Sequence, residues 1–274
     1  MQTNNVNISE LYGLDGQSSL ACFSFGTFRD DAVVEKRPTL IVVPGGGYAM
    51  VSKREGEPIA SYFMAKGYNT FILTYSVAPV RYPAQLLQLA ATVDYLHKHA
   101  EEYNIDEQRI YLVGFSAGGH LVGNFATDYF NINKRFGKEW NLQATAVCLS
   151  YPVISCECGH VQSFGNLFGE NADVDKTALD NVFNLNRAVT NKTLPSFVWT
   201  TFEDNCVPPV NSLKYAEACL AKGVKCELHM YPQGWHGLST CDALCNDQLQ
   251  PFFAKNNTWL AFCEQFFALF PQKQ

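Results

Sequence analysis

Short apolar runs alternate with helical patterns along most of the chain. Apolar and polar residues alternate over residues 20–28, which predicts an early strand. Further β-prone runs lie at residues 39–43, 69–77, 110–113, 144–153, 195–202 and 225–231. Helical spacing is found at residues 57–66, 83–103, 210–221 and 258–270, and helix-compatible residues follow residue 117. This order predicts an α/β fold with a mostly parallel central sheet and helices on both faces.

One stretch interrupts the alternation. Between about residues 155 and 193, Gly, Asn and Asp separate isolated aromatic residues such as Phe164, Phe168 and Phe183. Long irregular insertions in compact domains are usually functional, so we expect a small cap that shapes the acyl or alcohol pocket of a site. The alternative is a loosely packed surface excursion that its aromatic residues only anchor.

Length and composition indicate one ordinary globular domain. The chain has 274 residues, 47% hydrophobic and 17% charged, so residues 1–274 can form a single α/β domain that includes the cap-like insertion. No apolar run has the length of a membrane span, and residues 1–10 lack the basic start and apolar core of a secretory signal. We therefore expect a cytoplasmic protein without a membrane partner, although a removed signal would leave the same sequence.

Charge and cysteine patterns narrow the partners further. The formal net charge is −6 and the basic residues are scattered, which disfavours nucleic acid. The chain has ten cysteines, but Cys156/Cys158 and Cys241/Cys245 lack the paired C-x-x-C spacing of a zinc site. We expect reduced, mostly buried thiols and no metal or organic cofactor. A homo-oligomer stays an open alternative.

The most informative motif lies at residues 114–118, which read GFSAG and match G-x-S-x-G. A β-prone run precedes it and helix-compatible residues follow. A serine at a sharp strand-to-helix bend is exposed to a substrate carbonyl, and flanking glycines avoid collisions across the bend. So short a pattern also occurs by chance. The preceding strand and the Gly118-Gly119 pair favour Ser116 as a nucleophile.

A serine nucleophile needs an imidazole base, and the chain contains six histidines. His236 lies in a glycine-flanked loop just after a predicted strand, where a side chain can project over the strand ends. It is the candidate base. The other five histidines fit surface or structural positions: His97, His99, His120, His160 and His229. His120 is close to Ser116 in sequence, but as the fourth residue of the same helix it is expected to point into the scaffold.

The orienting acid is expected between Ser116 and His236, because α/β-hydrolases have the chain order serine, acid, histidine. Asp204 follows the predicted strand at residues 195–202, and prolines that can start the next helix come soon after it. It therefore lies at the carboxyl end of a strand, where sites form in parallel sheets. Glu203 is its only close rival, and position alone leaves both acids open.

Backbone donors for an oxyanion are expected from residues 44–48, which read PGGGY after a predicted strand. Glycines let backbone amides approach a substrate, so Gly46 and Gly47 are candidate donors together with the amide of Ala117. Gly45 is a weaker candidate. A phosphate-binding loop is disfavoured, because the run lacks the spaced G-x-G-x-x-G form and a following Gly-Lys-Ser/Thr.

The motifs follow one another in a familiar order: PGGGY (44–48), REGEPIA (54–60), IYLVGFSAGGHL (110–121), TFEDNCVPP (201–209) and YPQGWHGL (231–238). This order resembles α/β-hydrolase esterases named acetyl esterase, acetylxylan esterase-like or bifunctional acetyl/feruloyl esterase, which are related to the hormone-sensitive-lipase group. The resemblance covers nearly all of the chain after about residue 39. It implies an α/β-hydrolase fold and the following roles: Ser116 as nucleophile, His236 as base, Asp204 as orienting acid, and Gly46, Gly47 and Ala117 as oxyanion donors.

Two positions depart from that family pattern. Pro44 stands where the wider lipase group has histidine, which keeps the donor geometry plausible but removes a polar anchor of the loop. Gln88 replaces an acidic residue common in the corresponding helix, and we expect a change in local pairing rather than in chemistry. The REGEP segment at residues 54–58 is expected to be a structural salt-bridge and helix-start element rather than a substrate site.

The resulting hypothesis is a serine carboxylesterase that hydrolyses short-acyl esters through an acyl-enzyme. Its partner would be a small ester, with acetyl esters and acetylated sugars as candidates. An arylformamidase and a peptidase-type serine hydrolase are alternatives within the hydrolases. A catalytically inactive hydrolase fold used as a binding module is the alternative of another class, and the intact Ser116, Asp204 and His236 argue against it.

Overall fold

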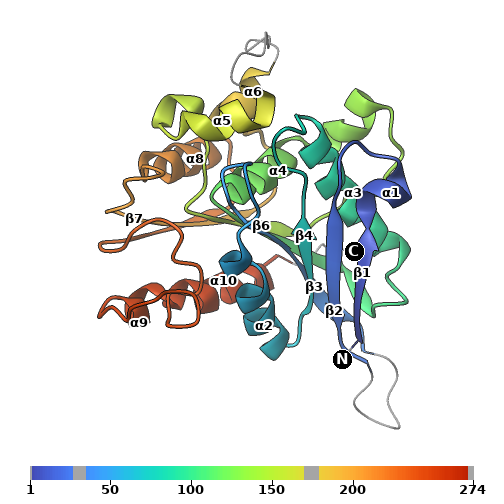
Figure 1. The fold of residues 1–274 in the computed structure, drawn as a ribbon, viewed down its shortest axis with the longest axis horizontal. Coiled ribbons are helices and arrows are strands. Elements are labelled where there is room, and N and C mark those ends of the chain that lie inside the picture. The colour runs from blue at the N-terminus through green and yellow to red at the C-terminus, as the bar shows by residue number, and fades with distance from the viewer. Residues whose placement is uncertain (1, 27–34, 170–178, 271–274) are drawn as a thin grey trace.

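The computed structural model describes residues 2–26, 35–169 and 179–270, and these form one sheet of eight strands (Figure 1). From edge to edge the strands are β1 (Gln2–Asn7), β2 (Ser19–Ser24), β4 (Asn69–Thr74), β3 (Arg37–Val43), β5 (Ile105–Phe115), β6 (Ala146–Ser150), β7 (Ser196–Thr201) and β8 (Cys226–Tyr231). β1 pairs antiparallel with β2, and β2 antiparallel with β4. In this spatial order, every neighbouring pair from β4 through β3 to β8 is parallel, which confirms the predicted mostly parallel sheet.

Helices cover both faces of this sheet. One face carries α1 (Ile8–Tyr12), α3 (Ala84–Lys98), α4 (Ala117–Phe136) and α8 (Val210–Ala221). The other carries α2 (Glu57–Ala65), α9 (Phe253–Asn256) and α10 (Thr258–Ala268), as Figure 1 shows. Both faces of the central strands are covered, so every residue of β7 is buried, including its serine and two threonines. The rings of Trp199 on β7 and Trp259 on α10 stack with their centroids 5.0 Å apart.

Several boundaries differ from the pattern. The sequence predicts neither β1 nor α1, because the residues of β1 are nearly all polar and give no apolar alternation. β2 ends at Ser24 rather than at residue 28, and residues 27 and 28 lie outside the described part of the chain. The helix predicted over residues 83–103 ends at Lys98, and the next strand already begins at Ile105. Asn104 has a left-handed φ of 54°, which turns the chain between them.

The cap segment, defined here as residues 155–193, is more helical than predicted. Outside residues 170–178, which are not described, it contains α5 (Val161–Phe168), α6 (Asp180–Phe183) and α7 (Leu185–Ala188). Helices of four to eight residues are too short to give a periodic pattern. The aromatic residues form one stack, with ring centroids 5.5 Å apart for Phe164 and Phe183 and 4.4 Å for Phe168 and Phe183. The aromatic residues therefore pack the described part of this segment against itself, and its role as a cap stays a prediction.

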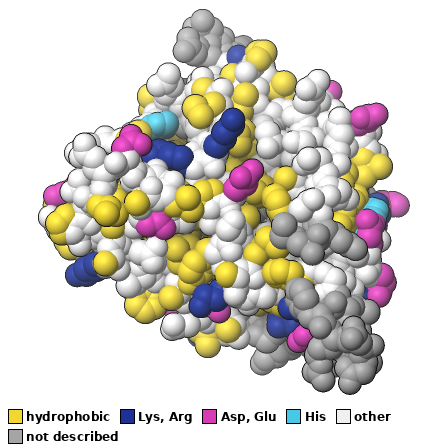
Figure 2. Space-filling view, turned by 60° about the horizontal axis from the view of Figure 1, so that its bottom comes forward, with side chains coloured by type: hydrophobic (Ala, Val, Ile, Leu, Met, Phe, Trp, Pro, Cys, Tyr) yellow, Lys and Arg dark blue, Asp and Glu magenta, His cyan; other side chains and the backbone are white. Residues whose placement is uncertain are grey.

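Basic side chains are scattered over the surface in the view of Figure 2. Lys and Arg side chains on this face stand singly, separated by hydrophobic and neutral polar groups, and they form no continuous stripe there.

None of the helices in the described ranges is long and apolar enough to cross a membrane.

Candidate active site

Ser116 occupies the bend between β5 and α4. Its φ of 53° and ψ of −117° lie outside the regions that side-chain-bearing residues usually adopt, so the bend is strained. The flanking glycines are required by packing. A Cβ atom on Gly114 would lie 2.4 Å from the carbonyl oxygen of Gly118, and one on Gly118 would lie 2.3 Å from that of Pro44. The chain thus forms the tight strand-to-helix turn that the G-x-S-x-G motif predicts.

Three side chains from distant parts of the sequence meet at this bend. His236 Nε2 lies 2.8 Å from Ser116 Oγ, and His236 Nδ1 lies 2.7 Å from Asp204 Oδ2. Ser116 and Asp204 are only 5% and 3% exposed. Because a carboxylate can only accept hydrogen bonds, Nδ1 donates to Asp204 and Nε2 is left to accept from the serine hydroxyl. This is the arrangement in which an imidazole can take a proton from an attacking serine.

The turn after β7 distinguishes the two rival acids. Asp204 Oδ1 accepts hydrogen bonds from the amides of Cys206 at 3.0 Å and Val207 at 2.8 Å, while its other oxygen faces the imidazole. Glu203 instead accepts from the amide of Gly234 at 3.0 Å. Glu203 therefore supports the loop that precedes His236, whereas Asp204 contacts the imidazole itself.

The glycine loop after β3 presents its amides unequally. The amide of Gly45 donates to Glu55 Oε2 at 2.8 Å and is not available to a substrate. In the described part of the chain, the amides of Gly46, Gly47 and Ala117 donate to no other group. Gly46 has a φ of 125°, and a Cβ atom there would lie 2.1 Å from the carbonyl oxygen of Met50. The loop thus requires glycine at this position and leaves the predicted donor amides free.

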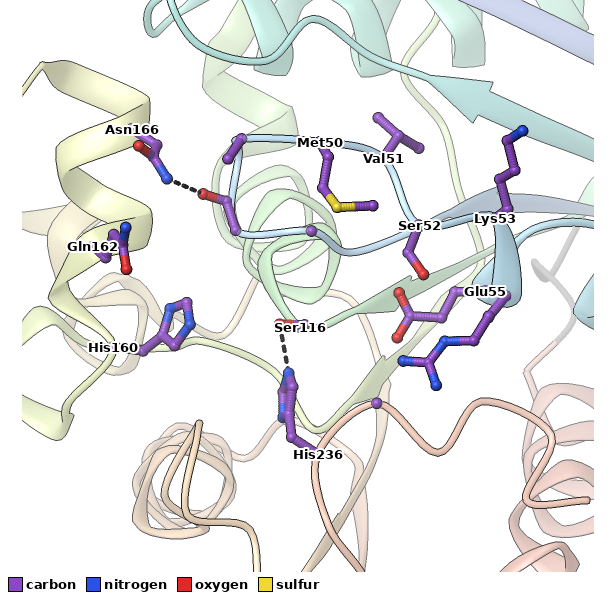
Figure 3. Close-up of a pocket in the computed structure, with 15 residues that line it drawn as sticks. Met50, Val51, Ser52, Lys53, Glu55, Ser116, His160, Gln162, Asn166 and His236 are labelled. Atoms are coloured by element: carbon purple, nitrogen blue, oxygen red, sulfur yellow. Dashed lines mark hydrogen bonds between the residues drawn. The ribbon is translucent and has the colours of Figure 1, made fainter. Parts of the chain in front are cut away.

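Ser116 opens into a cavity of about 710 Å³. In Figure 3 the segment with Met50 and Ser52 lies on one side of Ser116 and His236, and the cap side chains His160, Gln162 and Asn166 lie on the other. The full lining is Gly46, Gly47, residues 49–55, Ser116, His160, Gln162, Asn166, His236 and Gly237. The cavity therefore combines the free amides, the serine and a largely polar wall from the cap segment.

The cap segment is tied directly to the glycine loop. Asn166 donates to the carbonyl oxygen of Gly47 at 2.8 Å, and the amide of Tyr82 donates to that of Leu167 at 3.0 Å. His160, expected at a surface or structural position, has a half-buried side chain that also lines the cavity. It pairs with Ser163 Oγ at 2.9 Å, and burial together with the neighbouring His236 lowers its pKa. Nothing in the sequence around His160 indicates this position.

His120 lies within the scaffold, as expected from its place on α4. Its ring nitrogens contact the hydroxyl of Tyr48 and the carbonyl oxygen of Val182, each at 2.8 Å. Complete burial lowers the pKa of His120 to about 4. A neutral imidazole is therefore part of the link between the glycine loop and the cap segment.

The two remaining sequence features have structural roles. Gln88 is buried and contacts the amide of Ser76 at 2.8 Å and the carbonyl oxygen of Asp15 at 2.8 Å, so it pairs locally as expected.

The prediction of a salt bridge in the REGEP segment is wrong for Glu55. Its carboxylate accepts from the Gly45 amide and the Tyr151 hydroxyl, and no cation of the described residues forms an ion pair with it. A buried position favours such neutral donors over a solvated ion pair.

Seven cysteines are buried free thiols, and Cys206 is an exposed one; the buried thiols are Cys22, Cys148, Cys158, Cys219, Cys241, Cys245 and Cys263. Within residues 2–26, 35–169 and 179–270, no group of three or more His, Cys, Asp or Glu side chains is arranged to hold a metal ion.

Comparison with known protein families identifies the family of this chain. A family profile described as BD-FAE matches residues 28–218. The chain belongs to the BD-FAE family. Like other BD-FAE chains it has the α/β-hydrolase fold, which the carboxylesterase Cest-2923 from Lactobacillus plantarum shares with a TM-score of 0.85. That structure is 28% identical and covers 98% of each chain.

Curated relatives of this BD-FAE chain are longer proteins. Endo-1,4-beta-xylanase B from Butyrivibrio fibrisolvens is 32% identical over 88% of this chain, but the match covers 37% of that protein. An acetylxylan esterase from Xylanibacter ruminicola is 26% identical over 85% of this chain and 45% of its own length. The chain thus spans less than half the length of these two relatives. Its family and its structural neighbours are those of hydrolases that act on esters.

Proposed function

We propose that this chain is a serine carboxylesterase in which Ser116, His236 and Asp204 form the catalytic triad. The observation that carries the proposal is the continuous hydrogen-bonded chain from Ser116 Oγ through the imidazole to the carboxylate, with contacts of 2.8 and 2.7 Å. This chain of contacts opens into the cavity beside free backbone amides. A buried serine hydroxyl paired in this way is an activated nucleophile rather than a structural hydroxyl.

The reaction begins when His236 Nε2 takes the hydroxyl proton as Ser116 Oγ attacks the ester carbonyl. The carbonyl oxygen gains negative charge and accepts hydrogen bonds from the amides of Gly46, Gly47 and Ala117. Collapse of the tetrahedral intermediate breaks the bond to the alcohol oxygen, which leaves with the proton from the imidazolium. Water, deprotonated by the same imidazole, then attacks the acyl-enzyme. The bond from the acyl carbon to Ser116 Oγ breaks, Oγ regains the proton from the imidazolium, and the acid leaves. Asp204 holds the imidazole orientation and stabilises its charged form throughout.

The proposed substrate is a short-acyl ester, with acetylated carbohydrate as the candidate alcohol part. One relative is an acetylxylan esterase by name. The cap side of the cavity carries Gln162 and Asn166. The side-chain amide of Gln162, and the oxygen and second N–H of Asn166 beside its bond to Gly47, can pair with hydroxyl groups. The cap segment therefore acts as the alcohol-binding wall in this proposal, within a single α/β-hydrolase domain.

The decisive experiment compares wild type with Ser116→Ala on a chromogenic acetyl ester and with a fluorophosphonate probe. Loss of the nucleophile should lower kcat by about four to six orders of magnitude and abolish labelling. Ser61→Ala, on an exposed position of α2, is the matched control and should keep wild-type activity. Retained turnover in a pure Ser116→Ala preparation would overturn the proposal. Absence of labelling and turnover in the wild type would instead favour a binding module.

The same proteins tested on butyryl, feruloyl and N-formyl substrates identify the acyl preference. Acetyl esters should give the highest kcat/KM. A strong preference for the N-formyl amide over every ester would replace the esterase assignment with an arylformamidase.

A further inference from the structure

The buried carboxylate of Glu55 bridges two parts of the site that the proposed mechanism leaves unconnected. Glu55 is 3% exposed, and its two oxygens accept from the amide of Gly45 at 2.8 Å and from the hydroxyl of Tyr151 at 2.7 Å. We propose that Glu55, acting through Tyr151, is a positioning residue that fixes the oxyanion loop relative to the catalytic histidine. The inference rests on the proposed esterase function and concerns the same site.

On the oxyanion side, Glu55 holds the residue that immediately precedes the donor amides. Both backbone groups of Gly45 are engaged, since its carbonyl oxygen also accepts from the amide of Ser52 at 3.0 Å. Gly45 packs so closely on the nucleophile that an added Cβ atom would lie 2.9 Å from Cβ of Ser116. The Glu55 contact therefore fixes the starting point from which the amides of the next two glycines are directed toward the substrate.

On the histidine side, Tyr151 touches both the imidazole and the loop that carries it. Its ring meets that of His236 edge to face, with centroids 4.9 Å apart. Its hydroxyl accepts from the amide of Ser239 at 3.1 Å while it donates to Glu55. Ser239 in turn donates to the carbonyl oxygen of Arg54 at 2.6 Å, so the histidine loop is tied twice to the segment around Glu55.

The network needs a group with two acceptors and no donor. The Gly45 amide and the Tyr151 hydroxyl both point protons at Glu55, and a carboxylate can accept both. Burial and the adjacent Glu55 raise the pKa of Tyr151 well above its ordinary value, which keeps the hydroxyl protonated as a donor. In Glu55→Gln the amide nitrogen would face one of these two donors, so one contact must break and leave a buried proton unpaired.

The test compares Glu55→Gln and Tyr151→Phe with wild type on an aryl acetate. The carboxylate and the hydroxyl are buried and paired with each other and with backbone amides. KM should therefore stay within about twofold while kcat falls by about 10- to 100-fold. The double variant should be no slower than the slower single variant, since both substitutions break one network. Thermal unfolding and circular dichroism check that each variant is folded.

A second measurement reports on the oxyanion hole itself. Sulfur accepts hydrogen bonds weakly, so an aryl thionoacetate gains little from the donor amides, and the wild type should prefer the oxoester strongly. In Glu55→Gln this oxoester/thionoester ratio of kcat/KM should fall by about tenfold, because the amides no longer point at the oxyanion. A purely structural role of Glu55 would lower both rates together and leave the ratio unchanged.

Glu57→Gln is the matched control, because it makes the same change at an exposed acid two residues away, outside the network. It should behave as wild type in both measurements. If folded Glu55→Gln and Tyr151→Phe proteins keep wild-type kcat and the wild-type ratio, the inference is wrong while the esterase assignment stands. The esterase assignment fails separately, through activity that survives in Ser116→Ala.

Discussion

At the scale of single residues, the site depends on which atom of the imidazole carries its proton. The carboxylate of Asp204 holds Nδ1–H and so leaves Nε2 as the acceptor for Ser116. Asn in place of Asp204 can turn its NH₂ group toward Nδ1, which then becomes an acceptor and puts the proton on Nε2. The imidazole would keep its place and lose its ability to act as a base.

Asp204→Asn should therefore lower kcat by about 10⁴-fold while thermal stability changes little. Glu203→Gln is the control, since the neighbouring acid contacts the Gly234 amide rather than the imidazole. It should reduce activity by less than about tenfold. If the Glu203 variant loses more activity than the Asp204 variant, the acid has been assigned to the wrong residue.

A second residue-scale prediction concerns His120 and acid stability. Burial lowers the folded-state pKa of His120 to about 4, whereas in the unfolded chain it titrates near about 6.5. The unfolded state therefore binds more protons between these values, and the free energy of unfolding falls as pH decreases from about 6.5 toward 4. For this one group the loss at pH 5 relative to pH 7.5 is about 2 kcal/mol.

Urea unfolding at pH 7.5 and 5 measures this effect. His120→Gln keeps a donor and an acceptor for Tyr48 and Val182 but cannot titrate, so its free energy of unfolding should decrease less than that of wild type. His99→Gln, on a histidine at the end of α3, controls for loss of an imidazole elsewhere. Equal pH dependence in wild type and His120→Gln would show that His120 does not titrate in this range.

At the scale of elements, the site is a junction between the end of β3 and the start of α4. Gly118 packs against the carbonyl oxygens of Val43 and Pro44, so α4 and the glycine loop share one contact surface. Gly118→Ala would place a methyl group 2.3 Å from both oxygens. The helix or the loop must then move, and both carry parts of the proposed site.

Gly118→Ala should lower the free energy of unfolding by about 1–3 kcal/mol and slow fluorophosphonate labelling by about 10- to 100-fold. Gly123→Ala is the matched control in α4, because its methyl group would meet only side-chain ends, that of Leu185 at 2.8 Å and that of Leu149 at 3.7 Å. Replacing glycine by alanine within a helix should offset that contact and leave stability within about 1 kcal/mol. Equal behaviour of the two variants would argue against a shared contact at the junction.

The predictability of each element follows from how its residues are buried. β3, β6 and β7 each contain a run of apolar residues because helices cover both faces of the sheet, and these runs predict the strands directly. β1 is held in the sheet by antiparallel pairing with β2, and its polar sequence contains no pattern that indicates this pairing. The helices of the cap segment are stabilised by aromatic stacking between residues up to about twenty positions apart, so local periodicity cannot indicate them.

The residues of the site likewise divide into those that the sequence indicates and those that it does not. Ser116 and His236 could be selected in advance because each follows a strand that the sequence predicts, whereas only the family resemblance separates Asp204 from Glu203. The structure brings the three side chains together. Their catalytic roles stay predictions. The cavity position of His160 and the bridging contacts of Glu55 could not be selected, because both depend on contacts with loops far away in the sequence.

At the scale of the whole molecule, the cavity is suited to one kind of bond. Glycosidases need two carboxyl groups about 5 to 10 Å apart on either side of the scissile bond. Of the cavity-lining residues that the structure describes, Glu55 alone carries a carboxylate, and both of its oxygens are already engaged. Asp204 lies behind His236 and is 3% exposed. Among the described residues, the cavity therefore lacks the pair of acids that would cleave a sugar backbone, which agrees with the proposed ester cleavage.

On acetylated xylan, the polymer form of the proposed substrate class, the protein should release acetate without producing new reducing ends. Acetate and reducing ends measured in the same reaction test this, with an unrelated endo-xylanase as positive control for the polymer. Ser116→Ala should lose acetate release, because ester cleavage depends on the nucleophile. Reducing ends that form equally with wild type and Ser116→Ala would reveal a second hydrolytic centre, and the inference from the cavity's carboxylates would then be wrong. Because a glycosidase centre would not use Ser116, this result would leave the esterase assignment intact.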